Sequence, residues 1–142
     1  MKYVEDISAT LISATDKFFS RHWPSDVFGI PPKWSESWGF VGSIPNVGNA
    51  GCYALFSNEK LLYIGLSEDT IANRTAAYTR VARGGLSIPT ENRPYVPSEG
   101  WSDKGLTHIV TIGFPEEARY LAPALEVYLI KALRPPENIL GK

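Results

Sequence analysis

Side chains able to bind charge or move protons occur at four separated points of the chain: Tyr53, Tyr63, Arg74 and Glu126. An isolated glutamate beside an apolar helix face needs a cation or a hydrogen-bond donor, and its hard oxygens suit Mg²⁺ or Mn²⁺. An arginine on a partly apolar face is either salt-bridged or placed to hold phosphate oxygens bidentately. Tyrosines are poor bases at their ordinary pKa of about 10, so each needs activation by a charge or a water chain.

The two tyrosines lie in short apolar runs that predict a tight antiparallel hairpin. Gly51–Phe56 and Leu61–Gly65 are joined by polar residues 57–60, and aromatic and branched residues favour strands while Ser, Asn and charged residues favour turns. Side chains alternate between strand faces, so Tyr53 and Tyr63 are expected to stand near each other. The pattern alone favours tyrosines buried for packing over a catalytic pair.

The spacing of these residues adds a family resemblance. Gly51-Cys52-Tyr53 followed by Tyr63-Ile64-Gly65 resembles the paired motif that names the GIY-YIG nuclease superfamily. In that family the helix after the second strand carries an arginine and often, four residues on, a tyrosine or histidine, and Arg74 and Tyr78 have this spacing. The resemblance covers the chain from about Gly51 to its C-terminus.

The last part of the match resembles the family's metal-binding helix. Residues 125–138 carry Glu126 on an apolar helix, then Pro135-Pro136 and Asn138. The resemblance implies a metal-dependent endonuclease that hydrolyses phosphodiester bonds in DNA, with one divalent metal, Mg²⁺ or Mn²⁺, held by Glu126. It also implies products with 5′-phosphate and 3′-hydroxyl ends.

The resemblance assigns a role to each remaining site residue. Tyr63 would activate the attacking water, and Tyr53 would support it through hydrogen bonding or substrate orientation. Arg74 would hold phosphate oxygens. Tyr78 would bind phosphate or assist proton transfer, and Asn138 would brace the site.

One departure from the family pattern supports other interpretations. Many members place a lysine after the second motif, where this chain has Leu66-Ser67-Glu68, and loss of that charge weakens phosphate binding or leaving-group support. With a net charge of −1, this favours a catalytically inactive module of the same fold that binds nucleic acid or a protein. A third alternative is a structural or regulatory subunit. Its N-terminal aromatic extension would dock onto a partner, which is either a second copy of the chain or another protein.

For the fold, the sequence predicts a small α/β (α+β) domain with a three-stranded antiparallel sheet flanked by helices. The third strand is expected over Leu106–Phe114, with His108 as a packing residue rather than a metal ligand. The Arg74 helix is expected to be capped by Ser67 and to run to about Val81, where Gly84-Gly85 ends it. Residues 86–104 are predicted as a loop. The last helix opens at Pro115 and either kinks at Pro123 or restarts there.

The N-terminal part is predicted to be an extension, residues 1–48, on a nuclease-like domain, residues 49–142. Apolar spacing indicates an amphipathic helix over Asp6–His22, capped by Asp6 and stopped by Pro24, whose stripe packs on the sheet. Residues 23–49 hold three tryptophans and read as an ordered wrapping loop with a short edge strand near Trp38. Aromatic anchors are favoured over a base-stacking surface.

Composition indicates the compartment and the partners of the protein. Cys52 is the only cysteine, which fits a reducing, cytoplasmic compartment, and a small buried hydrophobe is favoured over a nucleophile. No apolar run is long enough to span a bilayer and no signal peptide is evident, so no membrane partner is expected. Contact with DNA must come from a local patch, for which residues 71–95 offer Arg74, Arg80, Arg83 and Arg93 against Glu91.

Overall fold

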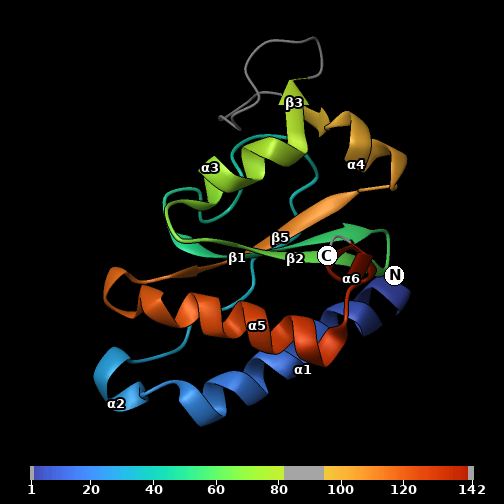
Figure 1. The fold of residues 1–142 in the computed structure, drawn as a ribbon. Helices are drawn as coiled ribbons and strands as arrows, with labels where there is room; N and C mark the ends of the chain where they lie inside the picture. The colour runs from blue at the N-terminus through green and yellow to red at the C-terminus, as the bar shows by residue number, and fades with distance from the viewer. Residues whose placement is uncertain (1, 82–94, 141–142) are drawn as a thin grey trace.

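An antiparallel sheet of three strands forms the middle layer of the protein. The structure is a computed structural model that describes residues 2–81 and 95–140. The strands are β1 (Ala50–Ser57), β2 (Lys60–Ser67) and β5 (His108–Phe114), and their order is β2-β1-β5, with both pairs antiparallel (Figure 1). The predicted hairpin and the predicted sheet are therefore confirmed.

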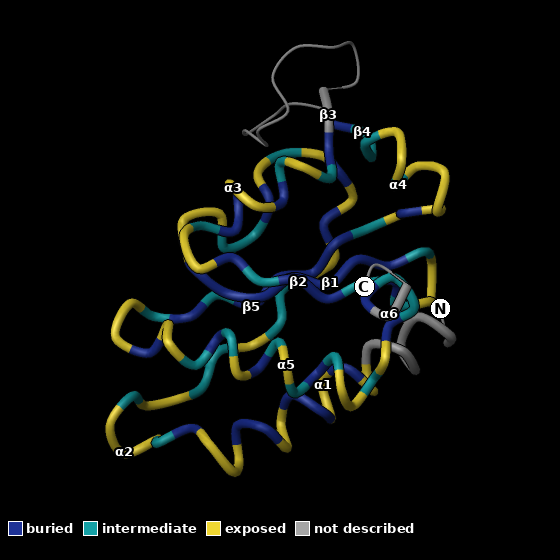
Figure 2. Tube along the Cα trace, in the orientation of Figure 1, coloured by how far each residue is buried: buried dark blue, intermediate teal, exposed yellow. Residues whose placement is uncertain are grey.

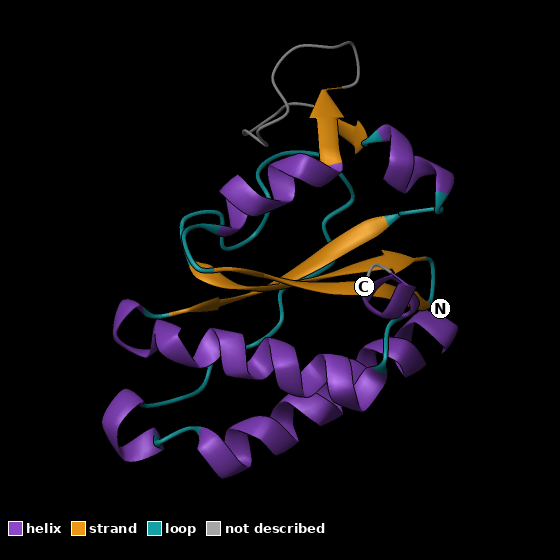
Figure 3. Cartoon of the chain, viewed as in Figure 1, coloured by secondary structure: helices purple, strands orange, loops and turns teal. Residues whose placement is uncertain are grey.

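Helices cover both faces of this sheet, as the sequence predicts. Figure 1 shows α1 (Lys2–His22) and α5 (Ala122–Leu133) below it, with α3 (Ile71–Thr75) and α4 (Glu99–Asp103) above it. Figure 3 distinguishes helices, strands and loops, and it includes the remaining short elements around these layers. They are α2 (Ser25–Phe28), α6 (Pro136–Leu140), the 3-10 helices η1 (Ala76–Tyr78) and η2 (Glu116–Leu121), and the strand pair β3 (Thr79–Val81) and β4 (Tyr95–Pro97).

The central strand β1 is buried on both of its faces. Its residues from Ala50 to Phe56 are all buried, because β2 and β5 pair with its two edges and helices cover its two faces (Figure 2). Cys52 and Ala54 pack toward α1 and α5, whereas Tyr53 and Leu55 pack toward α3 and α4. The alternation predicted from the sequence thus separates two hydrophobic clusters.

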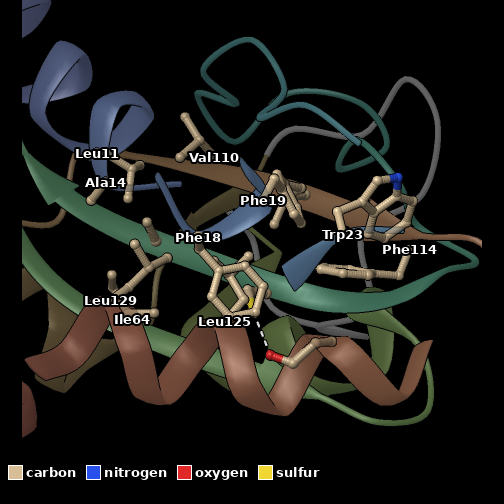
Figure 4. Close-up of a cluster of buried hydrophobic side chains, with 14 of the residues drawn as sticks. Leu11, Ala14, Phe18, Phe19, Trp23, Ile64, Val110, Phe114, Leu125 and Leu129 are labelled. Atoms are coloured by element: carbon tan, nitrogen blue, oxygen red, sulfur yellow. Dashed lines mark hydrogen bonds between the residues drawn. The ribbon is translucent and has the colours of Figure 1, made fainter. Parts of the chain in front are cut away.

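The larger cluster joins the N-terminal helix to the rest of the fold. Side chains of α1 (Leu11, Phe18), β2 (Ile64) and α5 (Leu125, Leu129) fill the layer between the sheet and these helices (Figure 4). Cys52 lies fully buried here and its thiol donates to the carbonyl oxygen of Ala122 at 3.4 Å, which confirms its prediction as a small buried side chain.

The N-terminal segment differs from prediction at its start and in its loop. Helix α1 begins at Lys2, so Asp6 lies inside the helix and does not cap it, while the end at His22 before Pro24 is as predicted. In place of an edge strand near Trp38, the segment forms isolated bridges, at Trp38, which pairs with Ile109, and at Val41. The indole of Trp38 donates to the carbonyl oxygen of Val41 at 3.0 Å, as expected of an anchor.

The other two tryptophans of the loop are also anchors. The Trp23 indole donates to the carbonyl oxygen of Gly29 at 2.9 Å, and that of Trp34 donates to the Thr15 hydroxyl at 2.8 Å. Because these indole N–H groups are used within the chain, the anchoring interpretation holds for the segment between α1 and β1.

The predicted helix through Arg74 is shorter than expected. Thr70 rather than Ser67 caps it, accepting a hydrogen bond from the backbone N–H of Asn73, because Ser67 still belongs to β2. After η1 the chain becomes strand β3, which pairs with β4, so extended structure replaces the helix expected up to Val81. β-branched residues with an available strand partner favour this outcome. Gly84-Gly85 lie outside the described residues.

The C-terminal half corrects one prediction, confirms one and decides between two alternatives at Pro123. Part of the predicted loop over residues 86–104 is β4 and α4. His108 stacks on Phe56, with ring centroids 5.0 Å apart, and so is a packing residue as predicted. Pro123 stands in the first turn of α5, so the helix restarts there after η2 and does not kink.

Gly65 offers a test of the hairpin packing. A Cβ at this position would overlap the Tyr53 ring across the strand pair, whereas a Cβ at Gly48 would meet open space. We expect Gly65→Ala to lower the free energy of unfolding by about 1–3 kcal/mol, the usual cost of overpacking, and Gly48→Ala to change it by less than about 0.5 kcal/mol. Urea unfolding measures both, and equal effects would contradict the packing described.

Candidate functional site

A polar cleft opens where the end of β2 meets α3 and α5. Its volume is about 490 Å³. The cleft brings together side chains that are far apart in the sequence, since Tyr63 comes from β2, Arg74 from α3 and Glu126 from α5. Its full lining is Tyr63, Leu66, Ser67, Glu68, Asp69, Asn73, Arg74 and Glu126.

Tyr63 belongs to a cluster of three tyrosines that come from different elements, with Tyr53 of β1 and Tyr78 of η1 behind it. The Tyr53 and Tyr78 hydroxyl oxygens are hydrogen-bonded at 2.9 Å, and the ring centroids of these residues are 5.5 Å apart. The Tyr63 ring lies 6.4 Å from that of Tyr53 and 6.2 Å from that of Tyr78. Gly65, which faces Tyr53 across the strand pair, leaves the space that the Tyr53 ring occupies.

A β-bulge in the hairpin places Tyr63 on this side of the sheet. Ser57 pairs with Lys60 and Phe56 with Leu61, yet Leu55 pairs with Tyr63, so Leu62 is an extra residue. As a result both Leu62 and Tyr63 face the cluster of Tyr53 and Leu55. With regular pairing Tyr63 would stand opposite Ala54 and face the other cluster, so the bulge aims its side chain at the cleft.

Arg74 is an exposed side chain in the last turn of α3. It is therefore not the costly buried arginine that the apolar helix face suggested. A hydrogen bond that Arg74 donates to Tyr53, together with the nearby phenols, raises the pKa of the guanidinium. Arg74 therefore carries a full positive charge at the wall of the cleft, next to the tyrosine cluster.

The tyrosines differ in their environments. Burial raises the pKa of Tyr53 to about 12, against the lowering effect of its hydrogen bonds to Tyr78 and Arg74. Burial, and then the neighbouring Tyr53, raise the pKa of Tyr78 as well. Both phenols hold their protons firmly, whereas the Tyr63 side chain is half-buried and lines the cleft. Tyr63 is thus the tyrosine that a molecule in the cleft would meet.

Glu126 is half-buried and points toward the cleft from α5, next to the fully buried Leu125. Burial raises the pKa of the Cys52 thiol, and the negative charge of Glu126 raises it further. The carboxylate therefore lies near Cys52, at the margin of the larger hydrophobic cluster. The prediction that Glu126 lies at the margin of the buried face is confirmed.

The cleft offers carboxylate oxygens, the ligands that hard divalent cations prefer. Glu68 and Asp69 add two carboxylates to that of Glu126. Among the described residues, however, no three His, Cys, Asp or Glu side chains are close enough to hold a metal together. Such a set does not fit a tetrahedral zinc site, but it fits Mg²⁺ or Mn²⁺, which keep several waters and use one or two carboxylates.

Asn138 is buried outside the cleft and pairs with the outer edge of β2. Its Oδ1 accepts the backbone N–H of Ile64 at 2.8 Å and its Nδ2 donates to the Ile64 carbonyl oxygen at 2.9 Å. The side-chain amide thus takes the place of a further strand beside Ile64, the residue after Tyr63. Of the six predicted site residues, three line the cleft, Tyr53 and Tyr78 support Tyr63 from behind, and Asn138 braces its strand.

Several neighbours of the site carry no signal in the sequence. Asp69 enters the cleft and accepts a hydrogen bond from the Asn73 side chain at 2.7 Å, a local pair that reads as an ordinary helix start. Trp101 of α4 contacts the rings of Tyr63 and Tyr78, although it lies in a segment predicted as loop. Of the proposed basic patch, only the Arg74 side chain falls among the described side chains.

Comparison of the chain with protein-family models, curated proteins and solved structures finds no match. Over the part of the chain that the structure describes, the helices are too short or too polar to cross a membrane. The residues of the cleft and their geometry are therefore what indicates a function for this chain.

The Asn138 brace predicts a measurable loss when the amide is removed. Asn138→Ala would leave the Ile64 N–H and carbonyl without their partner, which costs about 1–3 kcal/mol for a buried group. We expect lower stability and faster amide exchange at Ile64. Asn73→Ala, which removes an exposed side-chain hydrogen bond, should leave that exchange unchanged. Unchanged protection at Ile64 in Asn138→Ala would contradict the brace.

The buried phenols predict a pH dependence of folding stability. Unfolded tyrosines ionise near a pKa of about 10, whereas the pKa of Tyr53 is raised to about 12 and that of Tyr78 is raised too. Above pH 10 the folded state then holds more protons than the unfolded state. The contribution of these two phenols to the free energy of unfolding is therefore fully present below that pH and is lost as the pH rises.

Urea unfolding between pH 9 and pH 11 (about one unit either side of the free phenol pKa) checks this. The free energy of unfolding should fall less steeply with pH for the double variant Tyr53→Phe/Tyr78→Phe than for the wild type. The slope should differ by up to about 1.4 kcal/mol per pH unit for each phenol removed. The control Tyr120→Phe, at a tyrosine that is 63% exposed, should keep the wild-type slope. Equal slopes for all three proteins would argue against retained protons.

Proposed function

We propose that the protein is a metal-dependent endonuclease of the GIY-YIG type that hydrolyses phosphodiester bonds in DNA. The observation that carries the proposal is the convergence of Tyr63, Arg74 and Glu126 on one cleft. These side chains come from β2, α3 and α5, and they supply a phenol, a cation and a hard-oxygen ligand. Phosphodiester hydrolysis needs groups to manage protons and to stabilise charge on the phosphoryl oxygens.

Arg74 would bind the scissile phosphate. Its guanidinium is exposed at the cleft wall and pairs well with two phosphate oxygens at once. Its hydrogen bond to Tyr53 also ties the guanidinium to the tyrosine cluster behind the cleft. Arg74 would therefore be held in place to act on the substrate.

Tyr63 would first release its phenol proton to solvent through the open cleft, and its phenolate oxygen would then take a proton from the attacking water. The hydrogen-bonded pair of Tyr53 and Tyr78 packs against its ring and holds it in place. Both of these neighbours keep their protons, so they act as hydrogen-bond donors and not as competing bases. In this assignment the base is the one tyrosine of the cluster that lines the cleft.

Glu126 would hold the divalent cation, Mg²⁺ or Mn²⁺. When bound, this cation would supply Lewis-acid stabilisation of negative charge on the phosphoryl oxygens. Glu68 and Asp69 lie in the same lining and could hold waters of the cation. The buried free thiol of Cys52 fits a reducing compartment, and we place the protein in the cytoplasm.

A specific observation favours a second candidate, a catalytically inactive binding module of the same fold. Glu68 and Asp69 put negative charge in the cleft near the position where many family members carry a lysine, and this opposes phosphate binding. Docking of a second copy or another protein through the N-terminal extension stays a prediction, although its tryptophan N–H groups bond within the chain.

Cleavage of supercoiled plasmid with Mg²⁺ or Mn²⁺ tests the proposal. We expect nicking or linearisation by the wild type and a loss of at least about 100-fold in Glu126→Gln and Tyr63→Phe, the usual size of a lost acid–base group. Glu117→Gln, an exposed acidic residue of η2, is the matched control and should cleave like the wild type.

DNA binding separates the two candidates. For an endonuclease, Glu126→Gln should lose cleavage and still bind DNA in a filter or anisotropy assay. If the wild type binds DNA but leaves plasmid, branched and single-stranded substrates intact, the binding module is the correct function. If Glu126→Gln cleaves like Glu117→Gln, the metal assignment is wrong.

A further inference from the structure

The Tyr63 side chain contacts three aromatic rings. Tyr63 stands on β2, an edge strand that has β1 on one side only. Its half-buried ring lies 5.7 Å from that of Trp101, 6.2 Å from that of Tyr78 and 6.4 Å from that of Tyr53, measured between centroids. Of these neighbours Trp101 is the nearest, and it belongs to none of the motif segments.

Trp101 lies against two tyrosines of the cluster at once. Its ring meets that of Tyr63 at 58° and that of Tyr78 edge-on at 77°, with 5.4 Å between the latter centroids. The edge-on contact with Tyr78 is favourable and directional, and the tilted contact with Tyr63 places the indole against that ring. Trp101 thus limits how far the Tyr63 ring can turn toward α4.

Trp101 itself is held by its surroundings. Its carbonyl oxygen accepts the backbone N–H groups of Lys104 at 3.1 Å and Leu106 at 3.0 Å. The Lys104 ammonium lies 5.5 Å from the centroid of the Trp101 ring and 3.5 Å from a carboxylate oxygen of Glu137 in α6. Glu137 precedes Asn138, which pairs with β2 beside Tyr63. The ring and the strand of Tyr63 are therefore supported by the same corner of the fold.

We propose that Trp101 is a positioning residue that fixes the direction of the Tyr63 phenol into the cleft. This inference rests on the proposed function. Trp101 is not part of the cleft lining, so it acts through Tyr63 and not by touching the substrate. A reacting group misplaced by about 1 Å lowers the rate by about 100-fold, so loss of this support should affect the chemical step.

Steady-state cleavage of supercoiled plasmid with Mg²⁺ provides the test. For Trp101→Ala we expect kcat to fall by about 10- to 100-fold while KM stays within about 3-fold of the wild type. Trp101→Phe keeps an aromatic edge at this position and should recover most of kcat. The matched control is Trp34→Ala, which removes a half-buried tryptophan from the opposite cluster and should keep the wild-type kcat.

A double-mutant cycle distinguishes positioning from general support. If Trp101 acts through Tyr63, then adding Trp101→Ala to Tyr63→Phe should lower kcat by less than about 3-fold more. Full additivity of the two losses would overturn the inference. Should Trp101→Ala fail to fold, Trp101→Leu takes its place in the cycle, with thermal unfolding as the check.

Different results would overturn the role of Trp101 and the proposed endonuclease activity. An active wild type in which Trp101→Ala behaves like Trp34→Ala overturns the role of Trp101 and leaves the endonuclease proposal standing. A parallel fall of kcat and rise of KM in Trp101→Ala also overturns positioning, since it indicates lost substrate binding. A wild type that cleaves no substrate overturns the proposed function and this inference with it.

Discussion

The backbone of the edge strand β2 is the feature on which the candidate site depends. On its inner side an extra residue, Leu62, turns Tyr63 toward Tyr53 and the cleft. On its outer side the Asn138 amide pairs with both backbone groups of Ile64. An edge strand without such partners exposes unpaired donors and acceptors and is free to slip in register, and a slip of one residue would move Tyr63 to the other face of the sheet.

The two hydrophobic clusters have different parts in this arrangement. The larger one, between the sheet and helices α1 and α5, is apolar almost throughout and fixes α5, which carries Glu126 at its edge. The smaller one mixes apolar residues with tyrosines whose hydroxyls meet near Arg74. Burial of phenols is tolerable because each hydroxyl finds a partner, and this keeps the rings of the site rigid.

The cleft carries charges of both signs. Arg74 shares its lining with the carboxylates of Glu68, Asp69 and Glu126, so phosphate binding there would depend strongly on a bound cation. The same cleft geometry is therefore compatible with both candidates: the endonuclease would cleave DNA, and the inactive binding module would not. This balance of charges also explains why the overall net charge of −1 says little about the site, because only the local charges act on a bound phosphate.

Local patterns were enough to predict the hairpin, the third strand and the burial of Cys52, since each depends on residues close together in sequence. At Pro123 they left a kink and a restart open, and the structure shows the restart. The meeting of Tyr63, Arg74 and Glu126 was an expectation from the motif order. Its geometry depends on long-range packing: the bulge at Leu62, the pairing of Asn138 with Ile64 and the approach of Trp101. Local propensity also predicted too long a helix after Thr70, because it could not include the strand partner that β4 offers to β3.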